Sequence, residues 1–240
     1  MNAVSDQPLT DDSARMLVAP GFEHDLAPRW FSPDFWGARA RAVGTGGRGS
    51  AWFLDTQKGA MVLRHYLRGG FMAKLYDDSY TFLGYQRTRS FQEFRLLQAL
   101  SGLGLPVPEP IGAWVRRVGI LRYEARILIR RIPDAVPLPE AKVLSAPELW
   151  RDVGQVIRRF HDAGLDHADL NCDNILVAPE QIYLIDFDKC RLREKASPAA
   201  RWKQHNLARL GRSVQKRCAN LPASTRTRLW QALKEGYLSA

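Results

Sequence analysis

Two short polar segments, each beside an apolar run, constrain this chain more than any other feature. The first is His167-Ala168-Asp169-Leu170-Asn171-Cys172-Asp173-Asn174, and the second is Asp186-Phe187-Asp188. Apolar runs of strand length follow the first segment at 175–177 and precede the second at 182–185. This spacing predicts a short β-hairpin that holds the two polar loops side by side.

Such a hairpin would bring together Asp169, Asn174 and Asp186. Phosphoryl transfer needs one carboxylate to accept a hydroxyl proton, plus an amide and a second carboxylate to hold Mg²⁺ on a nucleotide. We therefore predict that Asp169 is catalytic, that Asn174 and Asp186 bind metal, and that His167 orients the loop. The pattern H-x-D-x-x-x-x-N followed by D-F-x is similar to the catalytic loop and metal motif of protein-kinase-like proteins. Asp188 departs from that pattern, because most kinases have a flexible glycine there.

A glycine-rich segment lies earlier in the chain. Gly44, Gly46 and Gly49 separate two predicted strands at 41–43 and 50–54. Because these glycines open a strand and not a helix, the context disfavours a dinucleotide-binding fold. It favours a hairpin whose backbone N–H groups cover nucleotide phosphates, with a plain flexible turn as the alternative.

Two cations are candidates for binding nucleotide phosphate. Arg64 lies in the predicted strand 60–66, where kinases place a lysine, and its planar fork can grip phosphate bidentately. Lys74 is the second candidate, with a solvated loop lysine as the plainer explanation. Glu93 ends the S-F-Q-E capping-box pattern at 90–93. Its carboxylate either caps that helix or pairs with the strand cation, and the sequence leaves both open.

The middle of the chain predicts a transition from a sheet to a helical half. Strands around Trp114 and at 127–129 would complete a five-stranded sheet, and residues 130–133 would form a hinge beside the adenine. A second capping box at 145–148 begins a helix with apolar positions at helical spacing, and a glycine ends it. His161 in this helix is interpreted as a packing or capping residue.

The 240 residues, 45% of them hydrophobic and 25% charged, are enough for one catalytic unit of two lobes. We predict an α+β, bilobal, protein-kinase-like fold with a mainly antiparallel N-lobe sheet and a reduced, mainly helical C-lobe. Residues 1–27 are expected to be a mobile leader, 28–132 the nucleotide-covering N-lobe, and 133–240 the C-lobe. Three cysteines without C-x-x-C spacing indicate neither a disulfide framework nor a zinc site, which fits a reduced cytosolic setting. No apolar run approaches the length of a membrane span.

The net charge of +10 is concentrated near the end of the sequence. Residues 189–240 hold 13 Lys and Arg against 2 acids, or +11, and the remaining residues hold 22 against 23, or −1. The helix expected here has an apolar face for packing and a basic face suited to an anionic membrane, and either interpretation is open. The apolar side comprises Leu207, Leu210 and Val214, and the basic side comprises Arg209, Arg212 and Lys216, with Arg217 as a further cation expected to contribute to membrane binding. An aromatic cluster at 30–36 is expected to pack on its lobe, with membrane-interface contact as the alternative.

With these motifs in order, the chain resembles the bacterial lipopolysaccharide kinases, most closely the 3-deoxy-D-manno-octulosonic acid (Kdo) kinases, over roughly residues 28–210. The most specific segments are V-L-R-H-Y at 62–66 with R-G-G at 68–70, G-L-P-V-P at 104–108, and H-A-D-L-N-C-D-N-I-L at 167–176 with I-D-F-D-K-C at 185–190. Heptose kinases of the same superfamily often place His at the position of Asn174, so they rank second.

The resemblance implies ATP as donor, Mg²⁺ as cofactor, and the 4-hydroxyl of a lipid-linked Kdo sugar on a lipid A precursor as acceptor. It also implies a peripheral position on the cytoplasmic face of the bacterial inner membrane, with the basic segment contacting the anionic surface. Only 52 residues follow Asp188, and no A-P-E-like anchor is present. A peptide-docking platform is therefore not expected, which favours a small or lipid-linked acceptor.

Two interpretations from other classes are weaker. A non-catalytic kinase-like module would be expected to lose Asp169, Asn174 or Asp186, and all three are present. A basic nucleic-acid-binding module could use residues 189–240, but this segment holds only three aromatic residues and no reader motif. No nucleic acid and no obligate protein partner are expected.

Overall fold

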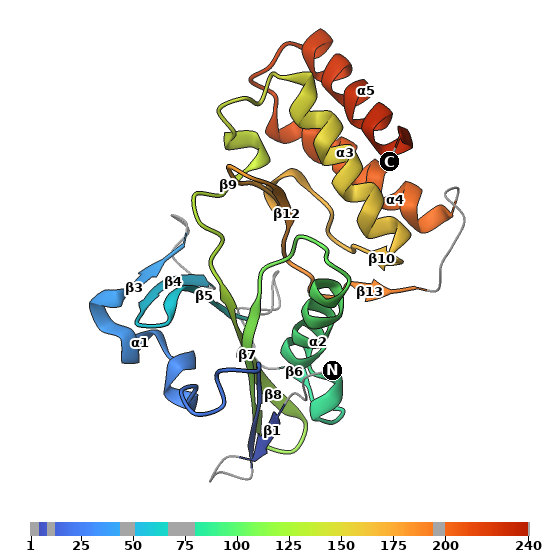
Figure 1. Cartoon of the computed structure of the whole chain (residues 1–240). Coiled ribbons are helices and arrows are strands. Elements are labelled where there is room, and N and C mark those ends of the chain that lie inside the picture. Colours follow the sequence, from blue (N-terminus) through green and yellow to red (C-terminus); the bar gives the residue numbers. More distant parts are fainter. Residues whose placement is uncertain (1–4, 9–12, 44–50, 67–79, 194–199, 240) are drawn as a thin grey trace. The chain divides into compact units, whose positions relative to one another are not determined.

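The computed structural model describes residues 5–8, 13–43, 51–66, 80–193 and 200–239 (Figure 1). The chain divides into two compact units. The first comprises Met1–Gln98 and Glu109–Arg131, and the second comprises Ala99–Pro108 and Ile132–Ala240. The fold is α+β and protein-kinase-like, as predicted.

The segment 99–108 was assigned to the N-lobe from the sequence, and it belongs to the second unit. Two hydrogen bonds explain this. The backbone N–H of Leu184 donates to the carbonyl oxygen of Pro106 at 3.2 Å, and the guanidinium of Arg159 donates to the carbonyl oxygen of Gly104 at 3.1 Å. Both partners come from residues far along the chain, so local sequence could not show the assignment.

The first unit is built on one antiparallel sheet with the strand order β1-β2-β7-β8-β5-β4-β3, and β6 pairs with β8. Its strands are β1 (Ser5–Pro8), β2 (Ala14–Val18), β3 (Ala40–Ala42), β4 (Ala51–Thr56), β5 (Gly59–His65), β6 (Tyr80–Thr81), β7 (Pro110–Val118) and β8 (Arg122–Arg130). Its helices are η1 (Pro28–Phe31), α1 (Pro33–Trp36), η2 (Gly37–Arg39), η4 (Tyr85–Arg87) and most of α2 (Arg89–Gly102). The sequence predicted five strands, and β1, β2 and β6 are the additions.

The predicted mobile leader is wrong for the residues of β2. This strand pairs with β7, with Val18 opposite Gly112 and Ala14 opposite Arg116. Ala14, Val18 and the two residues that precede Val18 are buried. The polar residues around this short apolar run masked it in the sequence, although burial of the run extends the hydrophobic core of the first unit.

The aromatic cluster at 30–36 packs on the first unit, which agrees with the packing interpretation. Phe31 and Trp36 are buried, and the indole Nε1 of Trp36 donates to the carbonyl oxygen of Trp30 at 2.9 Å. The rings of Trp30 and Trp36 meet edge to face at 5.1 Å.

The second unit is mainly helical. Its strands are β9 (Val136–Pro137), β10 (Leu165–Asp166), β11 (Ile175–Val177), β12 (Ile182–Leu184) and β13 (Arg191–Leu192). Its helices are η5 (Leu138–Glu140), α3 (Pro147–Asp162), η6 (Cys172–Asn174), α4 (Arg201–Arg217) and α5 (Ala223–Ser239). Helix α3 begins with Pro147 after an Ala146 N-cap that forms no side-chain hydrogen bond, so the predicted helix is present but the predicted capping box is not.

Helices α3 and α5 approach each other closely because glycines lie at their contact. A Cβ atom on Gly154 would come within 2.1 Å of the carbonyl oxygen of Leu233, and one on Gly236 within 2.0 Å of that of Arg151. Any larger residue at either position would force the helices apart. This packing supports α3, which leads directly into β10 and the polar loop that follows it.

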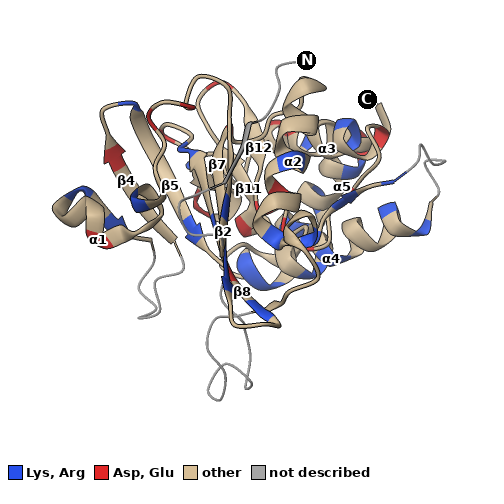
Figure 2. Ribbon diagram, turned by 90° about the horizontal axis from the view of Figure 1, so that it is seen from below, with Lys and Arg blue, Asp and Glu red and all other residues tan. Residues whose placement is uncertain are grey.

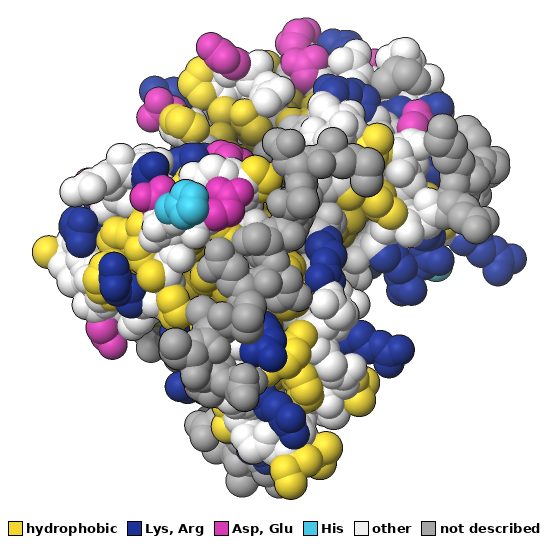
Figure 3. Space-filling view, turned by 60° about the horizontal axis from the view of Figure 1, so that its bottom comes forward, with side chains coloured by type: hydrophobic (Ala, Val, Ile, Leu, Met, Phe, Trp, Pro, Cys, Tyr) yellow, Lys and Arg dark blue, Asp and Glu magenta, His cyan; other side chains and the backbone are white. Residues whose placement is uncertain are grey.

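No helix among the described residues is both long and apolar enough to cross a membrane. Cationic residues recur along α4 (Figure 2). On the face shown in Figure 3, Lys and Arg side chains stand out at several separate places.

Candidate active site

The predicted hairpin is confirmed in the second unit. Strands β11 and β12 pair antiparallel, with Ile175 opposite Leu184. The backbone N–H of Ile185 donates to the carbonyl oxygen of Asn174 at 3.0 Å, which extends the pairing to the ends of both loops. Asn174 and Asp186 therefore lie at the same end of the hairpin.

The predicted catalytic loop, residues 167–174, is held by its own amide side chains. Asn171 caps the short helix η6 because its side-chain oxygen accepts from the backbone N–H groups of Asp173 at 2.9 Å and Asn174 at 3.2 Å. The amide nitrogens of Asn171 and Asn174 both donate to the carbonyl oxygen of Asp169, at 3.0 and 2.9 Å. The backbone of Asp169 is thus fixed from two sides. The side-chain oxygen of Asn174 stays an acceptor, since its nitrogen makes this contact.

His167 joins the two polar loops. Its Nε2 atom lies 3.0 Å from the carbonyl oxygen of Ile185, and a carbonyl only accepts, so Nε2 carries the proton. Burial lowers the pKa of His167, which keeps the imidazole neutral. The ring also packs against Phe187 at 5.4 Å. These contacts agree with the predicted orienting role.

The metal motif, residues 186–188, forms a tight turn anchored by Phe187. The Phe187 side chain is buried and lies 6.3 Å from the ring of Phe160 on α3. Among the described residues, Asp186 and Lys189 have positive φ angles of 63° and 62°, whereas Asp188 does not. The turn therefore places its left-handed residues on either side of Asp188, and an aspartate at that position causes no backbone strain.

The donors at the end of the hairpin suit a hard divalent cation. The carboxylate of Asp186 and the side-chain oxygen of Asn174 are both hard oxygen donors, the type that Mg²⁺ prefers. No group of three or more His, Cys, Asp or Glu side chains that could hold a metal occurs in the described parts of the chain. Any Mg²⁺ here would need further oxygens from a nucleotide or from water.

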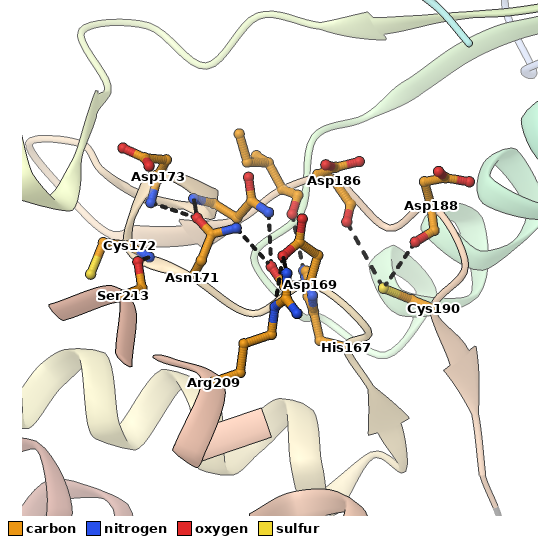
Figure 4. Close-up of polar contacts among 12 residues, drawn as sticks. His167, Asp169, Asn171, Cys172, Asp173, Asp186, Asp188, Cys190, Arg209 and Ser213 are labelled. Carbon is orange, nitrogen blue, oxygen red and sulfur yellow. Dashed lines mark hydrogen bonds and ion pairs between the residues drawn. The ribbon is translucent and has the colours of Figure 1, made fainter. Parts of the chain in front are cut away.

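One polar face of α4 contacts the catalytic loop along its length (Figure 4). The side-chain oxygen of Asn206 accepts from the backbone N–H of His167 at 3.0 Å. The hydroxyl of Ser213 accepts from the backbone N–H of Cys172 at 3.1 Å. Helix α4 therefore fixes both ends of the loop through backbone hydrogen bonds.

Two arginines on the same face of α4 pair with the carboxylates of the loop. The guanidinium of Arg209 donates twice to Oδ1 of Asp169, with Nε at 2.8 Å and Nη2 closer still. Arg217 contacts both carboxylate oxygens of Asp173 through Nε at 3.0 Å. The Arg209 and Asp169 side chains are 47% and 43% exposed, so this ion pair is open to solvent.

Sequence reasoning missed these contacts. It grouped Arg209 and Arg217 with Arg212 and Lys216 as cations that either face solvent or contact an anionic membrane. The spacing of Asn206, Arg209, Ser213 and Arg217 by three, four and four residues is the signal that could have revealed them, because such spacing forms one helix face. The predicted apolar face is present, since Leu210 and Val214 are buried and Leu207 is half-buried.

In the first unit, the strand cation and the helix acid lie in contact. Nη1 of Arg64 on β5 is 2.7 Å from Oε1 of Glu93 on α2, and the hydroxyl of Tyr66 donates to Oε2 of Glu93. The Glu93 side chain is 1% exposed and that of Arg64 is 23% exposed. The hydroxyl of Ser90 donates to the carbonyl oxygen of Trp114, so the S-F-Q-E segment does not form a capping box. Of the two alternatives for Glu93, pairing with Arg64 is the one observed.

The remaining candidates for phosphate binding lie outside the described residues. They are Gly44, Gly46, Gly49 and Lys74. Their assignments stay predictions.

Residues 33–237 match the lipopolysaccharide kinase (Kdo/WaaP) family. The chain belongs to this family of lipopolysaccharide kinases. It is 53% identical over 188 residues to a 3-deoxy-D-manno-octulosonic acid kinase of Stenotrophomonas maltophilia (strain K279a), which covers 78% of this chain and 74% of the relative.

Solved structures support the fold of this lipopolysaccharide kinase. WaaP in complex with acyl carrier protein is similar with a TM-score of 0.54 and 15% identity, over 94% of this chain and 89% of that one. The Rio2 kinase of Chaetomium thermophilum, solved as an ADP/Mg²⁺-phosphoaspartate complex, is similar with a TM-score of 0.50 and 20% identity, over 85% of this chain and 71% of that one.

Proposed function

We propose that this lipopolysaccharide kinase transfers a phosphoryl group from ATP to the 4-hydroxyl of a Kdo sugar on a lipid A precursor, in lipopolysaccharide core biosynthesis. The observation that carries the proposal is the 53% identity to a 3-deoxy-D-manno-octulosonic acid kinase, over most of both chains. The presence of Asp169, Asn174 and Asp186 in one connected loop system supports a catalytic protein over a binding module.

In the catalytic step, Asp169 accepts one proton. As the acceptor oxygen bonds to the γ-phosphorus, the bond from that phosphorus to the β–γ bridging oxygen breaks and ADP leaves. The hydroxyl proton moves to the carboxylate of Asp169. Hydrogen bonds from Asn171 and Asn174 to the Asp169 carbonyl hold the base in place, so little reorganisation is needed during the reaction.

Asp186 and Asn174 are the proposed ligands of Mg²⁺. Bound there, Mg²⁺ would neutralise charge on the nucleotide phosphates. The two oxygen donors and the hydrogen bond that turns the Asn174 nitrogen toward Asp169 support this role. The Rio2 kinase, a neighbour in fold only, was solved with ADP and Mg²⁺.

Arg64 is the proposed phosphate-binding cation of the first unit. Its contact with Glu93 restricts the side chain, and Tyr66 restricts Glu93 in turn. A restrained guanidinium loses less conformational entropy when it binds phosphate. Gly44, Gly46, Gly49 and Lys74 are proposed to assist as predicted from the sequence.

A defined acceptor panel tests the function. Purified protein would be incubated with ATP, Mg²⁺ and one of four acceptors: Kdo linked to a lipid A precursor, a heptose-containing core, a protein mixture or RNA. We expect stoichiometric phosphorylation of the Kdo acceptor alone, and we expect the product to show a phosphorus–proton coupling at the 4-position in NMR spectra. Preferential phosphorylation of heptose would overturn the proposal in favour of a heptose kinase.

We further propose that the protein is peripheral on the cytoplasmic face of the inner membrane, through cations of α4. Arg209 and Arg217 pair with loop carboxylates, so the proposal now rests on Arg212 and Lys216. Both side chains are exposed. Each cation near an anionic surface contributes about 1 kcal/mol, fading over a Debye length.

Vesicle sedimentation checks this localisation. Changing Arg212 and Lys216 together to Gln should reduce binding to phosphatidylglycerol vesicles by about tenfold or more, since two contributions of about 1 kcal/mol are lost. Turnover of a water-soluble Kdo acceptor should be unaffected. Vesicle binding that does not respond to salt or to the substitutions would contradict an electrostatic membrane contact.

A further inference from the structure

The ion pair between Arg209 and Asp169 leaves one carboxylate oxygen and one guanidinium edge available. Nε and Nη2 of Arg209 both donate to Oδ1 of Asp169. Among the described residues, Oδ2 of Asp169 and Nη1 of Arg209 have no hydrogen-bond partner. The base is thus held by one oxygen while the other can accept a proton. The edge formed by Nη1 and Nη2 can still bind a second planar anion.

Stability does not account for this arginine. Both side chains are nearly half exposed, and an exposed ion pair contributes little to the free energy of folding. Helix α4 is already fixed to the loop through Asn206 and Ser213, and it is anchored in the core by Leu210. Arg209 is therefore placed by other contacts and remains accessible to a ligand.

The proposed acceptor carries an anion close to the reacting hydroxyl. In 3-deoxy-octulosonic acid the carboxyl group is attached to C2 and the 4-hydroxyl to C4, with one ring carbon between them. When Oδ2 of Asp169 accepts the proton of the 4-hydroxyl, the acceptor carboxylate lies close enough to Asp169 for one guanidinium group to contact both carboxylates. A single arginine fork can span two carboxylates at that separation, one on each edge.

We propose that Arg209 bridges Asp169 and the carboxylate of the acceptor, and so selects a sugar acid over a neutral sugar. This inference rests on the proposed function and adds to it a specificity residue that lies on α4, outside both sequence motifs. The charge-assisted hydrogen bonds place the 4-hydroxyl beside the base. A neutral sugar would leave the free guanidinium edge unpaired and would gain no such alignment.

The test combines two acceptors with three enzymes. The acceptors are lipid-linked Kdo and the same molecule with its carboxylate converted to the neutral carboxamide. The enzymes are the wild type, Arg209→Gln, and Arg212→Gln as a control from the exposed side of the same helix. We expect the wild type to prefer the acid by about 10- to 100-fold in kcat/KM, the range for charge-assisted hydrogen bonds. The preference should fall below about threefold in Arg209→Gln and stay unchanged in Arg212→Gln.

The ratio of kcat/KM for the acid to kcat/KM for the carboxamide separates recognition of the acceptor carboxylate from positioning of Asp169. Arg209→Gln is expected to slow both acceptors by a common factor, because Asp169 loses its partner, and that factor cancels. If turnover of the variant is too slow to measure, the dissociation constants of the two acceptors from calorimetry give the same ratio. Arg209→Lys, which keeps the charge but not the fork, should retain part of the preference.

The outcomes distinguish this inference from the proposed function. An undiminished preference in Arg209→Gln, or no preference in a wild type that phosphorylates Kdo, would overturn the carboxylate-binding role. A wild type that phosphorylates neither acceptor would instead overturn the proposed function. Loss of the preference in Arg212→Gln as well would show a general charge effect, and would overturn the assignment to Arg209.

Discussion

Each unit has an arginine–carboxylate pair among its candidate site residues, Arg64 with Glu93 and Arg209 with Asp169, and these two pairs differ in their exposure to water. Glu93 is 1% exposed and also accepts from Tyr66, whereas Asp169 is 43% exposed and its Oδ2 has no hydrogen-bond partner among the described residues. A buried charge must keep its partner, because water cannot replace it. An exposed pair can exchange one partner for a substrate at little cost. The buried arginine–carboxylate pair of the first unit is thus a permanent contact. The exposed pair of the second unit can exchange part of its contact for a substrate.

The largest effect should come from removing the base of the exposed pair. Asp169→Asn keeps the shape of the side chain but cannot accept the hydroxyl proton, so turnover should fall by about 100-fold or more. ATP binding and thermal stability should change little, because the residue is exposed. Single-turnover kinetics, with a nucleotide-binding assay as control, would check this. A variant that retains near-normal turnover would show that Asp169 is not the base.

The next effect concerns the metal motif beside the same pair. Asp186→Ala should lower the affinity for Mg-ATP by about tenfold or more, because a hard carboxylate ligand is lost. Asp188→Ala is the matched control, two residues away in the same turn, and should bind Mg-ATP normally. Titration calorimetry with and without Mg²⁺ would measure both. Equal losses in the two variants would mean that general negative charge, and not a ligand at Asp186, supports binding.

The buried and exposed pairs should differ in their contribution to stability. Glu93→Ala removes the buried carboxylate that pairs with Arg64 and accepts from Tyr66, and it should lower the free energy of unfolding by about 2 to 3 kcal/mol. Arg209→Ala should lower it by less than about 1 kcal/mol. Urea denaturation of both variants gives the comparison. Similar losses would contradict the view that solvent exposure separates the two pairs.

The last expected effect concerns His161, a buried residue of α3 that the fold keeps uncharged. Burial, aided by Lys203, lowers the pKa of His161 from 6.5 to about 4, and its Nδ1 lies 2.8 Å from the hydroxyl of Tyr237. Below pH 6.5 the unfolded chain binds a proton that the folded chain excludes. The stability contribution is therefore complete above about pH 6.5 and declines as the pH falls toward 4.

This linkage predicts a change of about 2 kcal/mol between pH 7 and pH 5 that is absent in His161→Gln. Denaturation curves at the two pH values would measure it, and an equal pH dependence in both proteins would contradict it. The comparison of the wild type with His161→Gln thus separates a loss of activity caused by acid unfolding from a direct effect of pH on catalysis.

The local part of the site was predictable from the sequence. His167, Asp169, Asn174 and Asp186 lie within 20 residues, and the two apolar runs between them admit one short antiparallel register. The Asn171 cap of the short helix η6 was not predicted, although an asparagine is a common N-cap residue. The helix 147–162 was likewise predicted from its apolar spacing, although its N-cap was not.

Contacts between distant residues were not predictable in the same way. The sequence left Glu93 between two roles, and a partner 29 residues away on β5 decides for pairing. It assigned residues 1–27 to a leader, because β2 gains its partner only when Val18 meets Gly112. An isolated strand or helix cap contributes little to the free energy of folding. Burial against residues remote in the sequence therefore overrides the local secondary-structure propensity.

By itself, the sequence indicated the family, the β11–β12 hairpin and the groups that are proposed to accept a proton or to hold Mg²⁺. Only the tertiary structure decided which cations those groups meet. Arg209 lies 40 residues beyond Asp169, and a helix pattern specifies which residues share a face but not what that face contacts. The basic side of α4 therefore suggested a membrane in the sequence, while the folded chain pairs Arg209 and Arg217 with the catalytic loop. The physical reason is that a charge has no inherent partner until packing of apolar residues such as Leu210 fixes where its helix lies.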